Sequence, residues 1–282
     1  MIEAHAHDGT PRERRNLRVL LADDSVGTRL NLSIALKAFD PAVEIIEADN
    51  GRDTTDHLIK DDPDIAFVNV QLPDLSGAEA VAFAKMRGAR PTIFLMSNLV
   101  IPKWVELATE LDAYEFLKKP FDPDHVVELL ASVCRMRQPT RLLLVDDSQT
   151  ARSLVRRVLN SCRFRLDVDE TDTGLHALKL LTLANYDVAL LDFNMDGMDG
   201  LETACQAREA APDTALIMMS GSDNSSLAPA AKVFGVTAFV KKPFYARDID
   251  LALHKAFDLR RPYLLNTVTS AAEPRPRLLS VR

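Results

Sequence analysis

The sequence predicts an α/β protein with two doubly wound domains in tandem, each built on a five-stranded parallel sheet. Short, continuously apolar runs alternate with amphipathic segments of helical length, which is the pattern of βαβ units around a parallel sheet. In addition, LRVLLADDS at 17–25 returns as RLLLVDDS at 141–148, so the chain repeats itself at an offset of 123 residues, from Asp24 to Asp147. The same alternating pattern therefore occurs twice, as expected for two copies of one domain.

Each copy contains five apolar runs that we interpret as strands. Helical segments lie between them, for example 29–39, 78–87 and 124–137. In doubly wound domains of this size the first strand lies near the centre of the sheet. The predicted strands cover 19–22, 45–48, 65–70, 92–96 and 113–117 in the first copy, and 142–145, 166–170, 187–191, 215–219 and 236–240 in the second.

The repeat also preserves single residues along the whole length of both copies. So many coincidences at one constant offset do not arise by chance, and we interpret the chain as a tandem duplication. The matched pairs are Gly51 and Gly174, Asn69 and Asp192, Gly77 and Gly200, Ser97 and Ser220, Phe116 and Phe239, Lys119 and Lys242, and Pro120 and Pro243.

Domain boundaries are predicted where the periodic patterns stop. Residues 1–16 have no periodicity, and we expect a disordered arm there. The first domain is predicted at 17–138 and the second at 139–261, and the link between them is too short for independent tumbling. Residues 262–282 contain three prolines and no period, and we expect an irregular tail rather than an output domain.

Composition excludes several classes of function. The chain is 47% hydrophobic and 27% charged, with a formal net charge of −7, which argues against non-specific nucleic-acid binding. No apolar run is long enough to span a membrane, and the N-terminus has no signal-peptide core, so we expect a cytoplasmic protein without membrane insertion. Its three dispersed cysteines are expected to be reduced, small apolar residues.

Three acidic residues follow two of the strands predicted in the second copy. Asp146 and Asp147 come after 142–145, and Asp192 comes after 187–191. In a parallel sheet, ligands bind outside the carboxyl ends of the strands, so these three side chains should meet at one edge. A compact group of hard oxygen ligands predicts a Mg²⁺ site, because the carboxylates would otherwise repel one another.

Four motifs of the second copy resemble the receiver domain of two-component response regulators, close to the single-domain chemotaxis regulators. They are DD at 146–147, DFNMDGMDG at 192–200, MSGS at 219–222 and FVKKPF at 239–244. The resemblance implies a flavodoxin-like fold, with Asp192 as the phosphoacceptor. It also implies that Asp146, Asp147, Asp192 and the backbone carbonyl of Asn194 bind Mg²⁺, while Lys242 and Ser220 contact the phosphoryl group.

Phe239 occupies the aromatic switch position of that family. By resemblance, phosphorylation draws Ser220 inward and the ring of Phe239 follows; plain core packing is the alternative for this ring. Asp196 departs from the family, which commonly has a proline here. Its carboxylate either alters metal affinity or, as we expect, points to solvent.

The first copy keeps most of this site but lacks its nucleophile. Asn69 replaces the phosphoacceptor, and a neutral amide cannot attack phosphorus. Asn98 is larger than its counterpart Gly221 and could crowd the site. We therefore predict a pseudo-receiver that binds partners, whose remaining acids are either partly solvated or weak Mg²⁺ ligands. Its degenerate site comprises Asp23, Asp24, Asn69, Ser97 and Lys119.

The sequence thus predicts a response regulator that takes its phosphoryl group from a histidine kinase or phosphotransfer protein. We expect no enzymatic activity beyond Mg²⁺-dependent self-phosphorylation and slow self-dephosphorylation. Output would pass through an unknown protein target, and a homodimer is possible. The alternatives are the regulatory part of a larger enzyme such as a diguanylate cyclase, or a phosphate sink or scaffold. Five arginines near the first helix of the second copy form either a partner face or a solvated basic face: Arg152, Arg156, Arg157, Arg163 and Arg165. Trp104, with its apolar neighbours at 99–101, is either an interface residue or a core residue.

Overall fold

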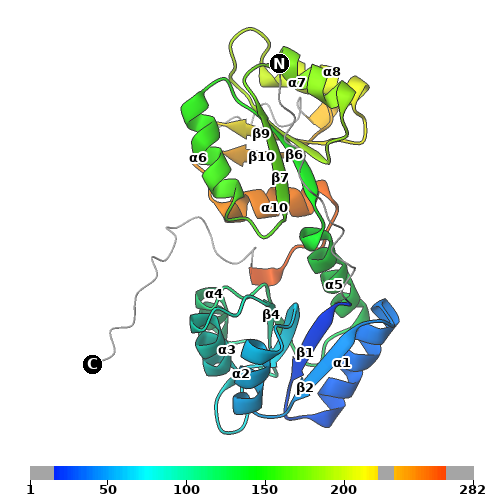
Figure 1. Ribbon diagram of the computed structural model, residues 1–282, viewed down its shortest axis with the longest axis vertical. Helices are drawn as coiled ribbons and strands as arrows, with labels where there is room; N and C mark the ends of the chain where they lie inside the picture. The colour runs from blue at the N-terminus through cyan, green and yellow to red at the C-terminus, as the bar shows by residue number, and fades with distance from the viewer. Residues whose placement is uncertain (1–15, 222–231, 265–282) are drawn as a thin grey trace, which may run out of the picture. The chain divides into compact units, whose positions relative to one another are not determined.

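The computed structural model describes residues 16–221 and 232–264 (Figure 1). The predicted arm and tail fall almost entirely outside these ranges. The described chain divides into two compact units, unit 1 up to Val127 and unit 2 from Glu128. The division lies inside helix α5 (Pro123–Arg137), and only two residues separate the end of α5 from the first strand of unit 2.

Unit 1 is a five-stranded parallel sheet in the order β2-β1-β3-β4-β5. Helix α1 lies on one face of the sheet, and α2 and α3 lie together on the other (Figure 1). Phe94 stacks on Phe67 and meets Tyr114 edge-on in the core. The elements are β1 (Arg18–Ala22), α1 (Val26–Phe39), β2 (Glu44–Ala48), α2 (Gly51–Lys60), β3 (Ile65–Asn69), α3 (Gly77–Met86), β4 (Thr92–Ser97), α4 (Pro102–Glu110) and β5 (Glu115–Lys118).

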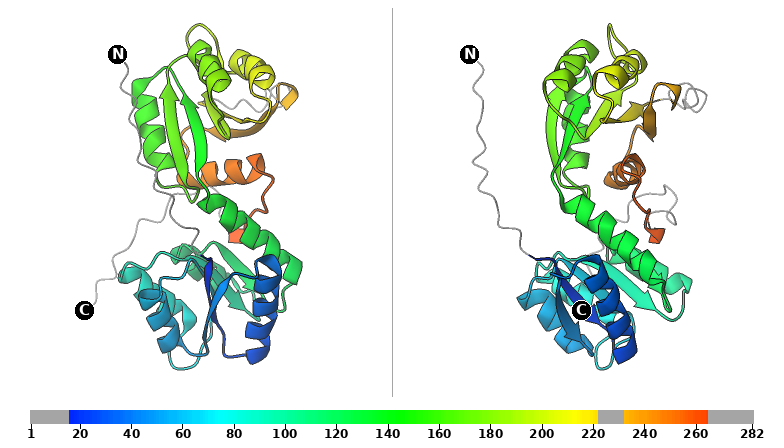
Figure 2. Two further views of the ribbon diagram at one scale, coloured as in Figure 1. Left: turned by 45° about the vertical axis from the view of Figure 1, so that its right-hand side comes forward. Right: turned by 90° about the vertical axis from the view of Figure 1, so that its right-hand side faces the viewer.

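Unit 2 repeats the same topology, in the order β7-β6-β8-β9-β10. Two further views show α6 on one face of its sheet, and α7 and α8 on the other (Figure 2). The elements are β6 (Thr140–Val145), α6 (Gln149–Leu159), β7 (Leu166–Thr171), α7 (Gly174–Leu183), β8 (Val188–Asp192), α8 (Gly200–Ala210), β9 (Ala215–Ser220), β10 (Val236–Lys241) and α10 (Ala246–Ala256).

The predicted fold class is confirmed, because all ten strands form at the predicted places and both sheets are parallel. The central strands are buried on both faces, which explains their continuous apolar runs: every residue of β3 and β8 is buried. Within the described residues, no helix has both the length and the apolarity needed to cross a bilayer.

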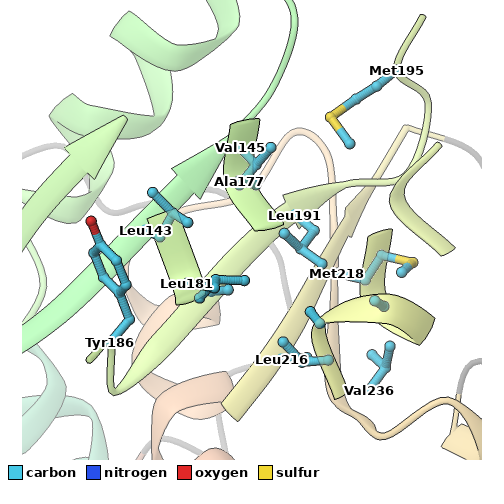
Figure 3. Close-up of a cluster of buried hydrophobic side chains, with 13 residues drawn as sticks. Leu143, Val145, Ala177, Leu181, Tyr186, Leu191, Met195, Leu216, Met218 and Val236 are labelled. Carbon is cyan, nitrogen blue, oxygen red and sulfur yellow. The ribbon is translucent and has the colours of Figure 1, made fainter. Parts of the chain in front are cut away.

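One core cluster of unit 2 lies between the sheet and helices α7 and α8 (Figure 3). Leu143, Leu191 and Met218 project from three adjacent strands toward Ala177 and Leu181 of α7. Burial of such side chains stabilises the fold by about 1.5–3 kcal/mol each. This packing fixes β6, β8 and β9 side by side, and it thereby fixes the relative positions of the residues at their carboxyl ends.

A glycine begins the helix that follows each central strand. A Cβ atom on Gly200 would overlap the backbone oxygen of Asp192, and one on Gly77 would overlap that of Asn69. The first turns of α8 and α3 therefore pack directly on the last residues of β8 and β3. Only a residue without a side chain permits this approach.

We predict that Gly200→Ala destabilises unit 2 by about 1–3 kcal/mol, because the added methyl group forces the backbone apart. Chemical denaturation would measure the change. Gly221→Ala is the matched control, since no atom lies within 4 Å of a Cβ built at that glycine. Equal stability of the two variants would contradict the prediction.

The buried His254 of α10 makes the stability of unit 2 depend on pH. Its ring meets Phe164 edge-on, and its Nδ1 lies 2.7 Å from the backbone oxygen of Asp250. Burial lowers the pKa of His254 below its ordinary value of 6.5, Arg163 and Arg261 add to the effect, and the hydrogen bond to the Asp250 carbonyl opposes it.

The unfolded chain therefore takes up a proton at a higher pH than the folded unit does. We predict that unit 2 loses stability as the pH falls below 6.5. The measurement is the denaturation midpoint above and below this pH, with His254→Gln for comparison. The variant should show the smaller loss, and an identical loss in both proteins would refute this role.

Candidate functional site

Four polar side chains meet at the carboxyl edge of the unit 2 sheet. Asp146 and Asp147 directly follow β6, Asp192 is the last residue of β8, and Lys242 directly follows β10. β8 is paired with β6 on one side and β9 on the other, and β10 is the next strand. Residues far apart in the sequence are thus brought together because neighbouring parallel strands end at one edge.

The three carboxylates form a compact group. Each of Asp146, Asp147 and Asp192 offers one oxygen atom, and these atoms all lie within 4.8 Å of one another. Asp146 and Asp192 are buried, whereas Asp147 is exposed. Three carboxylate oxygens with one open side suit Mg²⁺, which binds few protein oxygens and keeps several of its waters.

Lys242 bridges the two buried carboxylates. Its Nζ donates to Asp146 Oδ2 at 2.6 Å and to Asp192 Oδ1 at 2.9 Å. Burial disfavours the charged ammonium, but the hydrogen bonds to Asp146 and Asp192 and their negative charges outweigh it, so the pKa of Lys242 is raised. The side chain is therefore a firmly charged cation at neutral pH.

The pKa of Asp192 is also raised, but here burial is the cause rather than the opposing influence. Desolvation is the largest influence and raises the pKa of Asp192, and the charge of Asp146 adds to it. Lys242 and the backbone N–H of Phe193 act against the shift. Burial thus disfavours the ionised carboxylate of Asp192, and a cation bound beside it would stabilise that ionised form.

Backbone N–H groups orient the other two carboxylates. Ser148, which also caps helix α6, donates its N–H to Asp146 Oδ1 at 3.0 Å. Asp196 donates its N–H to Asp147 Oδ2, also at 3.0 Å. Pro73 stands at the equivalent position of unit 1 and has no N–H, so the exposed Asp196 supplies a donor that unit 1 lacks.

Arg152 is partly buried and makes two polar contacts within its own domain. Its Nη1 donates to the backbone oxygen of Asp146 at 2.7 Å, and its Nε lies 3.4 Å from Glu170 Oε2. Arg29 makes the equivalent contact to Asp23 in unit 1, at 2.6 Å. Both duplicated arginines thus hold the loop that begins the acidic site, and a partner contact at this helix stays a prediction.

The remaining predicted residues of unit 2 lie around this group. Ser220 is buried at the end of β9, and its backbone oxygen accepts from the Lys242 N–H at 2.7 Å. Phe239 is half-buried on β10 and packs against the core cluster. Asn194 lies in the exposed loop two residues after Asp192, and the bond between Lys242 and Pro243 is cis.

Unit 1 brings together the equivalent positions with different bonding. The buried Asp23 contacts Lys119. The Nδ2 of Asn69 donates to Asp24 Oδ1 at 3.1 Å and to the backbone oxygen of Gln71 at 2.6 Å.

The residues around the degenerate site also adopt defined positions. Ser97 ends β4 and accepts from the Leu99 N–H at 3.2 Å. Phe116 is buried, unlike Phe239. Leu99 is 63% exposed, and Trp104 is half-buried under the Lys103 ammonium, 5.5 Å from the ring centre.

Sequence reasoning missed the contacts made by main-chain donors and amides. The N–H of Asp196 donates to Asp147, and the amide of Asn69 donates to Asp24, the residue of unit 1 that matches Asp147. The only available signal was that the two copies differ at these positions. Pro73 stands in unit 1 where Asp196 stands in unit 2, and Asn69 stands where Asp192 does.

Comparison with known proteins gives one family match in each unit. A family model described as the response regulator receiver domain matches residues 19–131 and again 142–254. The chemotaxis protein CheY of Listeria monocytogenes is 33% identical over 116 residues, which are 41% of this chain and 97% of that protein. CheY-3 of Vibrio cholerae is 30% identical over 120 residues, or 42% and 92%.

Solved structures that match most of this chain have the same fold. One, described as a two-component system response regulator/GGDEF domain protein, covers 86% of this chain and 98% of its own, with a TM-score of 0.61. Its sequence is 23% identical, so the likeness supports the fold alone.

We predict that Asp196→Pro weakens Mg²⁺ binding to unit 2 roughly fivefold, because one hydrogen bond of about 1 kcal/mol to Asp147 is lost. Asp196→Ala is the matched control: it removes the same carboxylate but keeps the N–H, so its affinity should exceed that of the proline variant. Calorimetric titration with Mg²⁺ measures both. Equal affinities would show that the N–H does not position Asp147.

Proposed function

Because the chain belongs to the response regulator receiver family, we propose that it is a response regulator whose unit 2 accepts a phosphoryl group on Asp192. The donor would be a phosphohistidine on a histidine kinase or phosphotransfer protein. The observation that carries the proposal is the group of three carboxylates bridged by Lys242 at the edge of the unit 2 sheet.

The proposed step is a phosphoryl transfer between two side chains. An oxygen of the Asp192 carboxylate attacks phosphorus, a P–O bond forms, and the P–N bond to the donor imidazole breaks with its electron pair returning to the ring. The product is an aspartyl phosphate. Asp192 suits this role because its carboxylate is mostly buried but keeps 11% exposure, and it lies close to the exposed Asp147.

Charge compensation is the main task of the surrounding residues. Asp146, Asp147, Asp192 and the backbone carbonyl of Asn194 would hold Mg²⁺, which neutralises negative charge on phosphoryl oxygens. Lys242, which pairs with Asp192, would transfer one of its hydrogen bonds to the phosphoryl group. Removing one preorganised hydrogen-bond donor from a site that stabilises developing negative charge typically costs a factor of about 10²–10³ in rate.

Phosphorylation of Asp192 would change the surface of unit 2 through Ser220 and Phe239. Ser220 is buried at the end of β9, and Phe239 is half-buried on the adjacent β10. A hydrogen bond from Ser220 to a phosphoryl oxygen would draw the serine toward Asp192, and the ring of Phe239 would then move inward. Such a rearrangement would change the face of unit 2 presented to a target protein.

Unit 1 would contribute protein binding rather than phosphoryl transfer. Besides lacking a nucleophile, it exposes an apolar stripe on α1, where Val26, Leu30 and Ile34 are 69%, 58% and 60% exposed. At the same offset α6 of unit 2 carries polar residues, Gln149, Ser153 and Arg157. An apolar surface on only one of two duplicated helices favours a contact specific to unit 1.

A second candidate function is regulation of a catalytic domain elsewhere in a longer protein. The reading frame beyond Arg282 would decide this directly. A phosphate sink is a third candidate, and it differs from a switch in that partner affinity would be the same with and without phosphorylation of Asp192.

We predict that acetyl phosphate with Mg²⁺ adds one phosphoryl group to the protein, detected by intact-protein mass spectrometry. Asp192→Asn should abolish the addition, because an amide cannot act as the nucleophile. Asn69→Ala is the matched control in unit 1 and should leave labelling unchanged. Labelling that persists in Asp192→Asn would refute the proposed phosphoacceptor.

A further inference from the structure

The amide of Asn69 makes two hydrogen bonds that distinguish the unit 1 site from the unit 2 site. Its Nδ2 donates to Asp24 Oδ1 at 3.1 Å and to the backbone oxygen of Gln71 at 2.6 Å. Both partners are acceptors, so the amide nitrogen rather than the amide oxygen must face them. The orientation of this side chain is therefore determined by its surroundings.

The duplication identifies what these two oxygens correspond to in unit 2. At the 123-residue offset, Asp24 matches Asp147 and Gln71 matches Asn194. The carboxylate of Asp147 and the carbonyl of Asn194 are two of the oxygens that the proposed function assigns to Mg²⁺, and the inference rests on that assignment. One NH₂ group in unit 1 thus satisfies two oxygens that a cation would bind in unit 2.

The net charge of the unit 1 site also argues against a bound cation. Two carboxylates and one lysine leave a single net negative charge in the unit 1 site, whereas three carboxylates and one lysine leave two in unit 2. A divalent cation entering unit 1 would meet the weaker field. It would also have to break both amide hydrogen bonds, one of which is to a charged group and therefore among the stronger ones.

We propose that the Asn69 amide takes the place of the cation, so that unit 1 binds no Mg²⁺. The donor set of unit 1 does not fit the metal that the family implies. Its site stays in one bonded arrangement whether or not Mg²⁺ or a phosphoryl donor is present. Unit 1 is then a fixed module, and only unit 2 responds to the signal.

The test counts Mg²⁺ sites by isothermal titration calorimetry of the full chain. The wild-type protein should bind one Mg²⁺. Asp192→Asn should bind none, because it places in unit 2 the same amide that occupies unit 1. Asn69→Asp should bind two, because it restores the third carboxylate and removes the donor. The double variant should bind one.

Two wild-type sites, or one site remaining in Asp192→Asn, would overturn the inference while leaving phosphorylation of Asp192 intact. Absence of binding by the wild-type protein would instead contradict the metal site of unit 2, and a site gained in Asn69→Asp would still support the role of the amide.

Thermal unfolding gives a second readout that needs no phosphorylation. Mg²⁺ should raise the melting temperature of unit 1 in Asn69→Asp, where three carboxylates now repel one another, but not in the wild-type protein. A Mg²⁺-dependent shift of unit 1 in the wild-type protein would count against the proposal.

Discussion

Negative charge gathered at the carboxyl edge of a parallel sheet is the constraint on which both units depend. The fold delivers acidic side chains from separate strands to one small volume, and two of the three in unit 2 are buried. Carboxylates so close together are unfavourable unless something compensates their charge. Each unit provides a lysine that follows its last strand. The two units differ in which group compensates the remaining negative charge.

In unit 2 the compensation is left incomplete. Lys242 serves both Asp146 and Asp192, while the carboxylate of Asp147 accepts one backbone N–H and is otherwise open to solvent. In the proposed function, this incomplete compensation would allow the site to bind a cation and a phosphoryl group, and to change on binding. The rigid surroundings limit that change to a few residues, because the strands are packed in the core and Gly200 holds α8 against Asp192.

In unit 1 the same scaffold carries a site with one carboxylate fewer and one amide more. Asn69 replaces a charge with a donor, and that donor meets the carboxylate and the carbonyl that would otherwise need a cation. The two units can therefore be compared directly, because three residues around the site recur at matching positions. They are Arg29 and Arg152, the capping Ser25 and Ser148, and Gly77 and Gly200. At the acidic site itself the units differ at the position of Asn69 and Asp192, which decides whether charge remains to be balanced.

The sequence alone determined the architecture, the duplication and the identity of the acidic residues. Apolar runs mark buried strands, and a residue just after such a run must lie at the sheet edge, so Asp146, Asp147 and Asp192 could be placed together without coordinates. Only the tertiary structure decided that Arg152 turns inward, that the N–H of Asp196 meets Asp147, and that the Asn69 amide faces Asp24. The physical reason is that periodicity specifies where a strand ends, whereas the direction of a single donor depends on loop dihedrals and rotamers that are set by contacts between distant segments.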